Sequence, residues 1–149
     1  MNDEYFMRQA IVLAKEAAEE GEVPVGAVVV FDGKIVGAGR NRREISKNAL
    51  AHAEIEAINE ACRALGGWRL WQCDMYVTLE PCPMCTGAII NSRMKRLVYG
   101  ASDYKAGSCG SVVDLFSLPY NHKPEVAKGV MQEECAALLT DFFKKLRKK

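Results

Sequence analysis

Apolar residues recur at three- and four-residue spacing in two long stretches near the ends of the chain, and this spacing predicts an amphipathic helix in each. The first stretch covers residues 3–20 and ends at Gly21, and the second covers residues 133–149. We expect the inward-facing stripe of the second helix to consist of Cys135, Leu138, Leu139, Phe142 and Leu146.

Runs of β-branched and aromatic residues predict five strands. Residues 25–31 and 34–40 flank Asp32-Gly33, a typical two-residue hairpin turn, so these two strands should pair antiparallel. Three shorter strands are expected at residues 75–79, 96–101 and 126–130. The order strand, helix, strand over residues 75–101 favours a right-handed parallel crossover.

Helical spacing returns at residues 51–65, with Ile55, Ile58, Cys62 and Leu65 predicted as the buried stripe. Another helix is expected at residues 85–91. Two segments lack clear periodicity and are predicted to be loops, residues 40–50 and residues 102–124, the second with a short helix near residues 112–118. Loops as long as residues 102–124 are uncommon in compact domains and are usually functional, so this segment is a candidate functional loop.

Composition narrows the class of protein. A chain of 149 residues is predicted to form a single domain, residues 1–149. The net charge of +1 argues against a protein that coats nucleic acid with a globally basic surface, and leaves only local basic patches for RNA. The sequence begins without a secretory signal pattern and its longest apolar run, residues 23–31, is too short to span a bilayer. We therefore expect a cytoplasmic protein with no membrane association.

Two short motifs carry the candidate chemistry. His52 and Glu54 lie in Ala51-His52-Ala53-Glu54, and Cys82 and Cys85 lie in Glu80-Pro81-Cys82-Pro83-Met84-Cys85. A Cys-x-x-Cys pair alone could be a redox pair or half of a structural zinc site. Combined with His-x-Glu, the motifs favour a catalytic zinc, since one His and two Cys leave a fourth tetrahedral position open. The other cysteines, Cys62, Cys73, Cys109 and Cys135, are scattered and are interpreted as small buried residues.

Glu54 is the candidate proton carrier. At about 100° per residue it falls on the inward side of its helix, where a carboxylate needs a partner or a catalytic role. The alternative is that it lies at the solvated helix end and satisfies free backbone donors. Residues two apart on a regular helix point nearly opposite ways, so His52 must lie at or before the first turn if both side chains reach one metal. Pro81 and Pro83 likewise place Cys82 at a helix start.

The chain resembles a known family. Four stretches carry the resemblance: residues 22–28, 51–55, 78–85 and 134–143. The zinc motifs alone are typical of the cytidine-deaminase-like superfamily. The first and last stretches are similar to bacterial tRNA-specific adenosine deaminases. Where that family commonly has Asp-Pro-Thr, this chain has Asn48-Ala49-Leu50, which affects the conformation of that loop and any RNA contact it makes.

The resemblance implies a three-layer α/β fold of the cytidine-deaminase-like type, a mixed five-stranded sheet flanked by helices. It implies a homodimer that converts the wobble adenosine of a tRNA anticodon stem-loop to inosine. One Zn²⁺ per chain would be held by His52, Cys82 and Cys85, and Glu54 would shuttle protons. The implied adenine pocket includes Val25, Asn41 and the backbone of Ala53. The implied RNA contacts are Asp103, Lys105, Asn121 and His122; a surface loop histidine is an equal alternative for His122.

Two other functions stay open on the sequence. A deaminase of a free nucleobase or nucleoside (guanine, cytosine or adenosine) would use the same zinc site, and a zinc-stabilised binding module would not need Glu54 at all. The basic ending, Lys144-Lys145-Leu146-Arg147-Lys148-Lys149, also has two interpretations. It is either a solvated helix end favoured by the helix dipole or a patch that contacts RNA phosphates.

Overall fold

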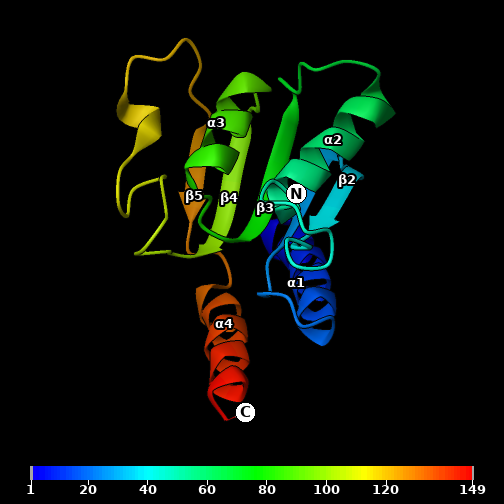
Figure 1. Cartoon of the computed structure of the whole chain (residues 1–149). Helices are drawn as coiled ribbons and strands as arrows, with labels where there is room; N and C mark the ends of the chain where they lie inside the picture. The colour runs from blue at the N-terminus through cyan, green and yellow to red at the C-terminus, as the bar shows by residue number, and fades with distance from the viewer. Residues whose placement is uncertain (1, 149) are drawn as a thin grey trace.

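The structure, a computed structural model, describes residues 2–148 and is built on one mixed five-stranded sheet (Figure 1). The strands lie in the order β2-β1-β3-β4-β5, with bounds β1 Gly26–Phe31, β2 Lys34–Arg40, β3 Cys73–Leu79, β4 Arg96–Ala101 and β5 Glu125–Lys128. β1 pairs antiparallel with β2 and β3, whereas β3, β4 and β5 are parallel. The predicted hairpin and the predicted parallel pairing are both confirmed.

Helices cover both faces of the sheet and make three layers (Figure 1). One core cluster joins α2 (Ala53–Leu65) and α3 (Pro83–Asn91) to one face, and the other joins α1 (Asp3–Glu19) and α4 (Gln132–Arg147) to the opposite face. Neighbouring strand residues alternate between the clusters: Val29 and Met75 face α2, whereas Val28 and Tyr76 face α1. Both faces are therefore buried, which explains the continuous apolar strands.

Several turns follow the residue types at their centres. Asp32 and Gly33 both have positive φ, 51° and 75°, as a two-residue hairpin turn requires. Gly66 ends α2 in the left-handed region. β5 ends at Lys128 instead of continuing to residue 130, because Gly129 has a φ of +80° and leaves the extended region.

In two helices the predicted buried stripe includes a residue at the C-terminal end that is exposed. Leu65, at the last turn of α2, is 39% exposed, and Leu146 of α4 is 56% exposed. The buried face of α2 consists of Ala53, Glu54, Ala57, Ile58 and Ala61. Of α4, only Cys135 is buried, because the C-terminal half of this helix extends past the sheet (Figure 1). The prediction of an inward Leu146 was wrong, since helical spacing cannot show where the partner surface ends.

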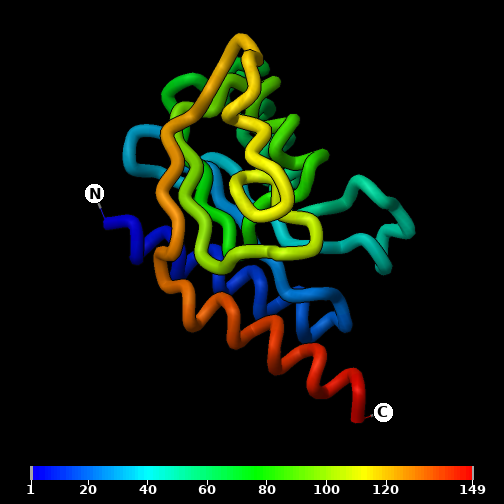
Figure 2. The backbone as a smooth tube through the Cα atoms, turned by 90° about the vertical axis from the view of Figure 1, so that its left-hand side faces the viewer, coloured from blue at the N-terminus to red at the C-terminus, as the bar shows by residue number. Residues whose placement is uncertain are grey.

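The N-termini of α2 and α3 lie at the end of the sheet where β3 has its C-terminus. The long segment between β4 and β5, yellow in Figure 2, loops out beside those strands and contains a single short 3₁₀ helix, Leu115–Ser117. Among residues 2–148 the structure shows no helix that is both long and apolar enough to cross a membrane.

Candidate metal centre and active site

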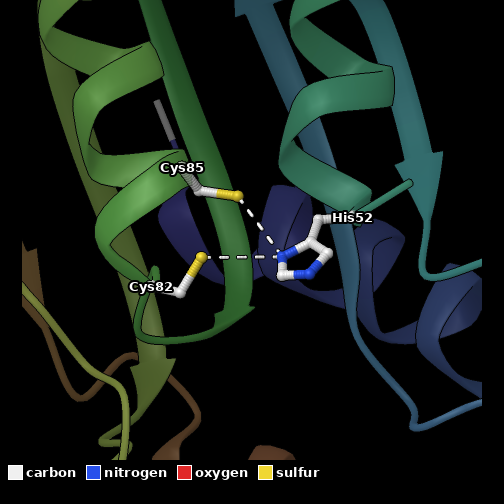
Figure 3. A group of neighbouring side chains, drawn as sticks. All are labelled: His52, Cys82 and Cys85. Carbon is white, nitrogen blue, oxygen red and sulfur yellow. Dashed lines mark hydrogen bonds between the residues drawn. The ribbon is translucent and has the colours of Figure 1, made fainter. Parts of the chain in front are cut away.

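Two helix N-termini bring the motif residues together. His52 is the N-cap residue of α2, and Cys82 is the N-cap residue of α3, with Pro83 in its first turn. Cys85 lies in the first turn of α3 and is buried. Because His52 has extended backbone angles, its side chain can reach the same point as that of Glu54, as the spacing argument required. The side chains of His52, Cys82 and Cys85 point toward one another in Figure 3.

The distances between these side chains suit a tetrahedral zinc ion. His52 Nδ1 lies 3.6 Å from Cys82 Sγ and 3.6 Å from Cys85 Sγ. Zinc–nitrogen bonds of about 2.0 Å and zinc–sulfur bonds of about 2.3 Å at a tetrahedral angle separate the two ligand atoms by about 3.6 Å. All three ligand atoms lie within 4.8 Å of one another. This His-Cys-Cys group could therefore hold a zinc ion without rearrangement.

The three side chains also share protons when no metal is bound. The hydrogen bond from the Cys85 thiol, and then that from His52, lower the pKa of Cys82 to about 4 against the opposing effect of burial. The hydrogen bond to Cys82 raises the pKa of His52, and the bond between the two cysteines, with burial, raises the pKa of Cys85. The Cys85 thiol therefore keeps its proton and donates it to the Cys82 thiolate. A bound metal ion would displace these shared protons.

Glu54 is buried beside this group, with 4% of its surface exposed. Burial, with a smaller contribution from the negative charge of Cys82, raises the pKa of Glu54 to about 7. A carboxyl group with such a pKa can accept or release a proton at neutral pH. Glu54 is therefore not a solvated residue at the helix end, which was the alternative interpretation of its position.

A cavity of about 200 Å³ opens onto His52 and Glu54. Its other walls come from four segments, at Val23 and Val25, at Asn41 and Arg43, at Leu79, Glu80 and Cys82, and at Asp103 and Ala106, with Ala53 beside His52. The volume lies below the several hundred Å³ typical of drug-sized ligands. It suits a small flat group such as a single base.

Asn41 and the buried Glu22 hold one wall of this cavity. The Asn41 amide donates to the Val23 carbonyl, 3.1 Å, and accepts from the Arg43 backbone N–H, 3.1 Å. The Glu22 carboxylate accepts the backbone N–H groups of Glu44 and Ile45. These bonds fix the predicted loop at residues 40–50 against the start of β1.

The structure brings most, but not all, of the predicted site residues together. Val25, Asn41, His52, Ala53, Glu54, Cys82 and Asp103 line the cavity, and Cys85 lies behind it. Lys105 is exposed and does not line it. His122 donates from Nε2 to the Met94 carbonyl, 2.6 Å, just before the start of β4. That position is at the opposite end of β4 from the cavity, so the structure does not bring Asn121 and His122 to the base site of the same chain.

Five cavity residues had no role assigned from the sequence: Val23, Arg43, Leu79, Glu80 and Ala106. Glu80 and Leu79 stand inside the recognised motif, and Ala106 stands in the long loop. A carboxylate directly before Pro81-Cys82 was a signal that could have been followed, because such a residue at a strand end needs partners when buried.

Comparisons with known proteins agree with this geometry. A sequence profile for the family described as MafB19-like deaminase matches residues 1–147. Over 148 residues the chain is 50% identical to the tRNA-specific adenosine deaminase of Bacillus subtilis (strain 168), covering 99% of this chain and 92% of that protein. The chain belongs to the tRNA-specific adenosine deaminase family.

Solved structures of deaminases have the same fold. A structure from studies of A-to-I editing by tRNA:A34 deaminases at the wobble position of transfer RNA superposes with a TM-score of 0.88 at 47% identity, covering 91% of this chain and 99% of that chain. Guanine deaminase from Bacillus subtilis superposes with a TM-score of 0.68 at 35% identity, covering 100% of this chain and 96% of that chain. The predicted α/β fold with its mixed sheet is confirmed, and the likeness to the tRNA enzyme is the stronger of the two.

Proposed function

We propose that this chain, acting as one deaminase domain, converts the wobble adenosine of a tRNA anticodon to inosine and releases ammonia. The observation that supports it most directly is the buried Glu54 beside His52, Cys82 and Cys85 at the floor of a base-sized cavity. The choice of tRNA rests on the full-length similarity to tRNA-specific adenosine deaminases.

His52 Nδ1 and the two cysteine sulfurs would hold one zinc ion per chain, since their separation and softness fit that metal. When bound, zinc supplies a hydrolytic nucleophile at neutral pH by lowering the pKa of water to about 7. The N-termini of α2 and α3 both point at the group, and their partial positive charge favours the two thiolates.

Glu54 would move the protons. It would take one proton from the attacking water and deliver it to ring N1 of adenine. It would then take the remaining proton of the hydroxyl added at C6 and deliver it to the amine, so that the C6 carbonyl forms and ammonia departs. Its pKa of about 7 suits both uptake and delivery, because both protonation states are populated at neutral pH.

The base would be held by the cavity walls. Val25 offers an apolar surface to the ring, and Asn41 still has one amide N–H and one lone pair beyond its two hydrogen bonds. Ala53 lies in the first turn of α2, where backbone N–H groups lack a partner within the helix. Its N–H is thus free to donate to the base.

The RNA would have to present an unstacked base. Flipping a base out is least costly in a single-stranded loop, which an anticodon provides. We propose that Asp103 and Lys105 contact flanking nucleotides beside the cavity. Asn121 and His122 stand far from the cavity of their own chain, so any RNA contact they make lies elsewhere. A homodimer and a cytoplasmic site of action, where tRNA is found, complete the proposal.

A second candidate is a free guanine deaminase, favoured by the 35% identity to the Bacillus subtilis enzyme of that name. The deciding experiment offers the zinc-loaded chain tRNA, free adenosine, guanine and cytidine side by side, and measures inosine in tRNA and ammonia release. We expect inosine at the wobble position only. Activity on guanine alone would replace the proposal by the second candidate.

The same assay tests the role of Glu54. Glu54→Gln should retain zinc and lose at least about a hundredfold in kcat, the usual contribution of a general acid–base group. Glu56→Gln is the matched control, because Glu56 lies on the same helix but lines no part of the cavity. Full activity of Glu54→Gln would remove Glu54 from the mechanism.

A further inference from the structure

Glu80 is a buried carboxylate that stands between the last residue of β3 and the Pro81-Cys82 turn, with 2% of its surface exposed. It accepts hydrogen bonds from the backbone N–H groups of Asp103 at 3.0 Å, Cys109 at 3.0 Å and Ser111 at 3.1 Å. The Ser111 hydroxyl donates a fourth, short bond. All four donors belong to one segment, residues 103–111.

These bonds are strong and directional. Removing a carboxylate from water is costly unless its oxygens are satisfied, and hydrogen bonds to a charged acceptor are about twice as strong as those between neutral groups. The two Glu80 oxygens divide their donors, since Oε1 receives Asp103 N and Ser111 Oγ while Oε2 receives Cys109 N and Ser111 N. The carboxylate therefore fixes both ends of the segment at once.

Gly107 permits this approach. A Cβ atom at Gly107 would lie 2.4 Å from the Glu80 carboxyl carbon and 2.4 Å from the Asp103 carbonyl oxygen. No side chain fits at such distances. The segment can thus wrap around Glu80 only with glycine at this position.

The same segment forms a wall of the cavity through Asp103 and Ala106. It belongs to no strand or helix. Its other links to this region are a backbone bond from Ser108 N to the Pro81 carbonyl and a hydrogen bond between Cys109 Sγ and Thr86 Oγ1, next to Cys85. Glu80 is therefore the main attachment between residues 103–111 and the motif that carries Cys82. The position of Asp103 relative to the metal ligands depends on it.

We infer that Glu80 is a positioning residue for RNA binding: it holds residues 103–111 in place as a wall of the base cavity, and does not take part in proton transfer. The inference rests on the proposed tRNA substrate. It predicts that loosening the attachment weakens binding of the anticodon stem-loop and leaves the chemical step largely intact, a change in KM without an equal change in kcat.

The test uses two variants that are distant in sequence from the zinc ligands. Ser111→Ala removes the hydroxyl donor, and Ser111→Thr restores it. Gly107→Ala places a methyl group against Glu80, and Gly67→Ala is its control because a Cβ there meets nothing within 4 Å. Each zinc-loaded protein is assayed for KM and kcat on an anticodon stem-loop.

We expect Ser111→Ala and Gly107→Ala to raise KM by about tenfold, the loss of roughly one charge-assisted hydrogen bond, with kcat within about twofold of the parent chain. Ser111→Thr and Gly67→Ala should keep the parent KM. An unchanged KM in the first two variants, or a fall in kcat alone, would overturn the inference.

A second measurement separates this inference from the proposed function. Backbone hydrogen exchange should accelerate at Asp103, Cys109 and Ser111 in Glu80→Gln, while the strands of the sheet keep their protection. Unchanged exchange at those amides would overturn the inference even if tRNA is the substrate. No inosine from the zinc-loaded parent chain would overturn the proposed function, with the exchange result still deciding whether Glu80 holds the loop.

Discussion

His52 Nδ1 and Cys85 Sγ lie 3.6 Å apart although 33 positions separate the two residues in the chain. The two atoms meet because α2 and α3 begin at the same edge of the sheet and each directs its first turn at the same point. Each helix alone supplies only part of the ligand set, and packing against the same sheet brings the two parts together.

Replacement of one ligand should release the metal. We expect Cys85→Ser to retain little zinc and to unfold at lower temperature, since zinc at a hundred times its dissociation constant stabilises the folded state by about 2.7 kcal/mol. Cys62→Ser is the control because Cys62 is outside the group. Metal analysis and thermal unfolding with and without a chelator check this. Equal zinc contents in the two variants would contradict the assignment.

Zinc affinity should rise with pH. The raised pKa values of His52 and Cys85 mean that metal binding must release protons from the group. Competition with a coloured chelator between pH 6 and 8, with proton release followed in weak buffer, measures this. A pH-independent affinity would show that the group is already deprotonated without metal.

The stability of the metal-free chain should depend on Glu54. Its pKa is about 7 when folded and near 4.5 when unfolded, so the folded state holds the proton more tightly. This contribution to the free energy of unfolding is fully present below pH 4.5 and is lost as pH rises through 7, by about 3 kcal/mol at about 1.4 kcal/mol per pKa unit. Urea unfolding of the zinc-free parent chain and Glu54→Gln at pH 5 and pH 8 gives the difference. A variant that follows the parent at both pH values would exclude Glu54 as the source.

Gly26→Ala should destabilise the fold. A Cβ at Gly26 would lie 2.0 Å from the Ala10 carbonyl oxygen of α1, and backbone cannot move aside as a side chain can. Overpacking of this kind costs about 1–3 kcal/mol. Urea unfolding beside Gly67→Ala measures it, and similar unfolding midpoints for both variants would mean that α1 shifts at little cost.

The basic end of α4 should contribute to RNA binding. Lys144, Lys145, Arg147 and Lys148 are exposed, and none forms an ion pair within residues 2–148. Replacing Lys144 and Lys145 with Gln should weaken tRNA binding and reduce the slope of affinity against salt by about 1 for each phosphate that the variant no longer neutralises. Replacing Lys34 and Lys128 with Gln is the matched control, because it removes the same charge from exposed lysines outside α4. An unchanged salt slope would support the solvated helix end.

Local chemistry accounts for what could be predicted. The Asp32-Gly33 turn, the inward Glu54 and the placement of His52 before the first helical turn each depend on residues a few positions apart, so spacing and residue type suffice. The pairing of His-x-Glu with Pro-Cys-x-x-Cys indicated a shared metal because that ligand set has few other uses.

Only the tertiary structure decided which distant segments meet. The sequence by itself determined the strands, and it predicted the metal ligands and the proton carrier. It did not show that Glu80 accepts four hydrogen bonds from residues 103–111, that His122 contacts Met94, or that Leu146 is exposed. These facts depend on where β4 ends, how the long loop folds back and how far α4 extends past the sheet. Contacts of that kind are set by the packing of elements far apart in the chain, and periodicity within a single element carries no information about them.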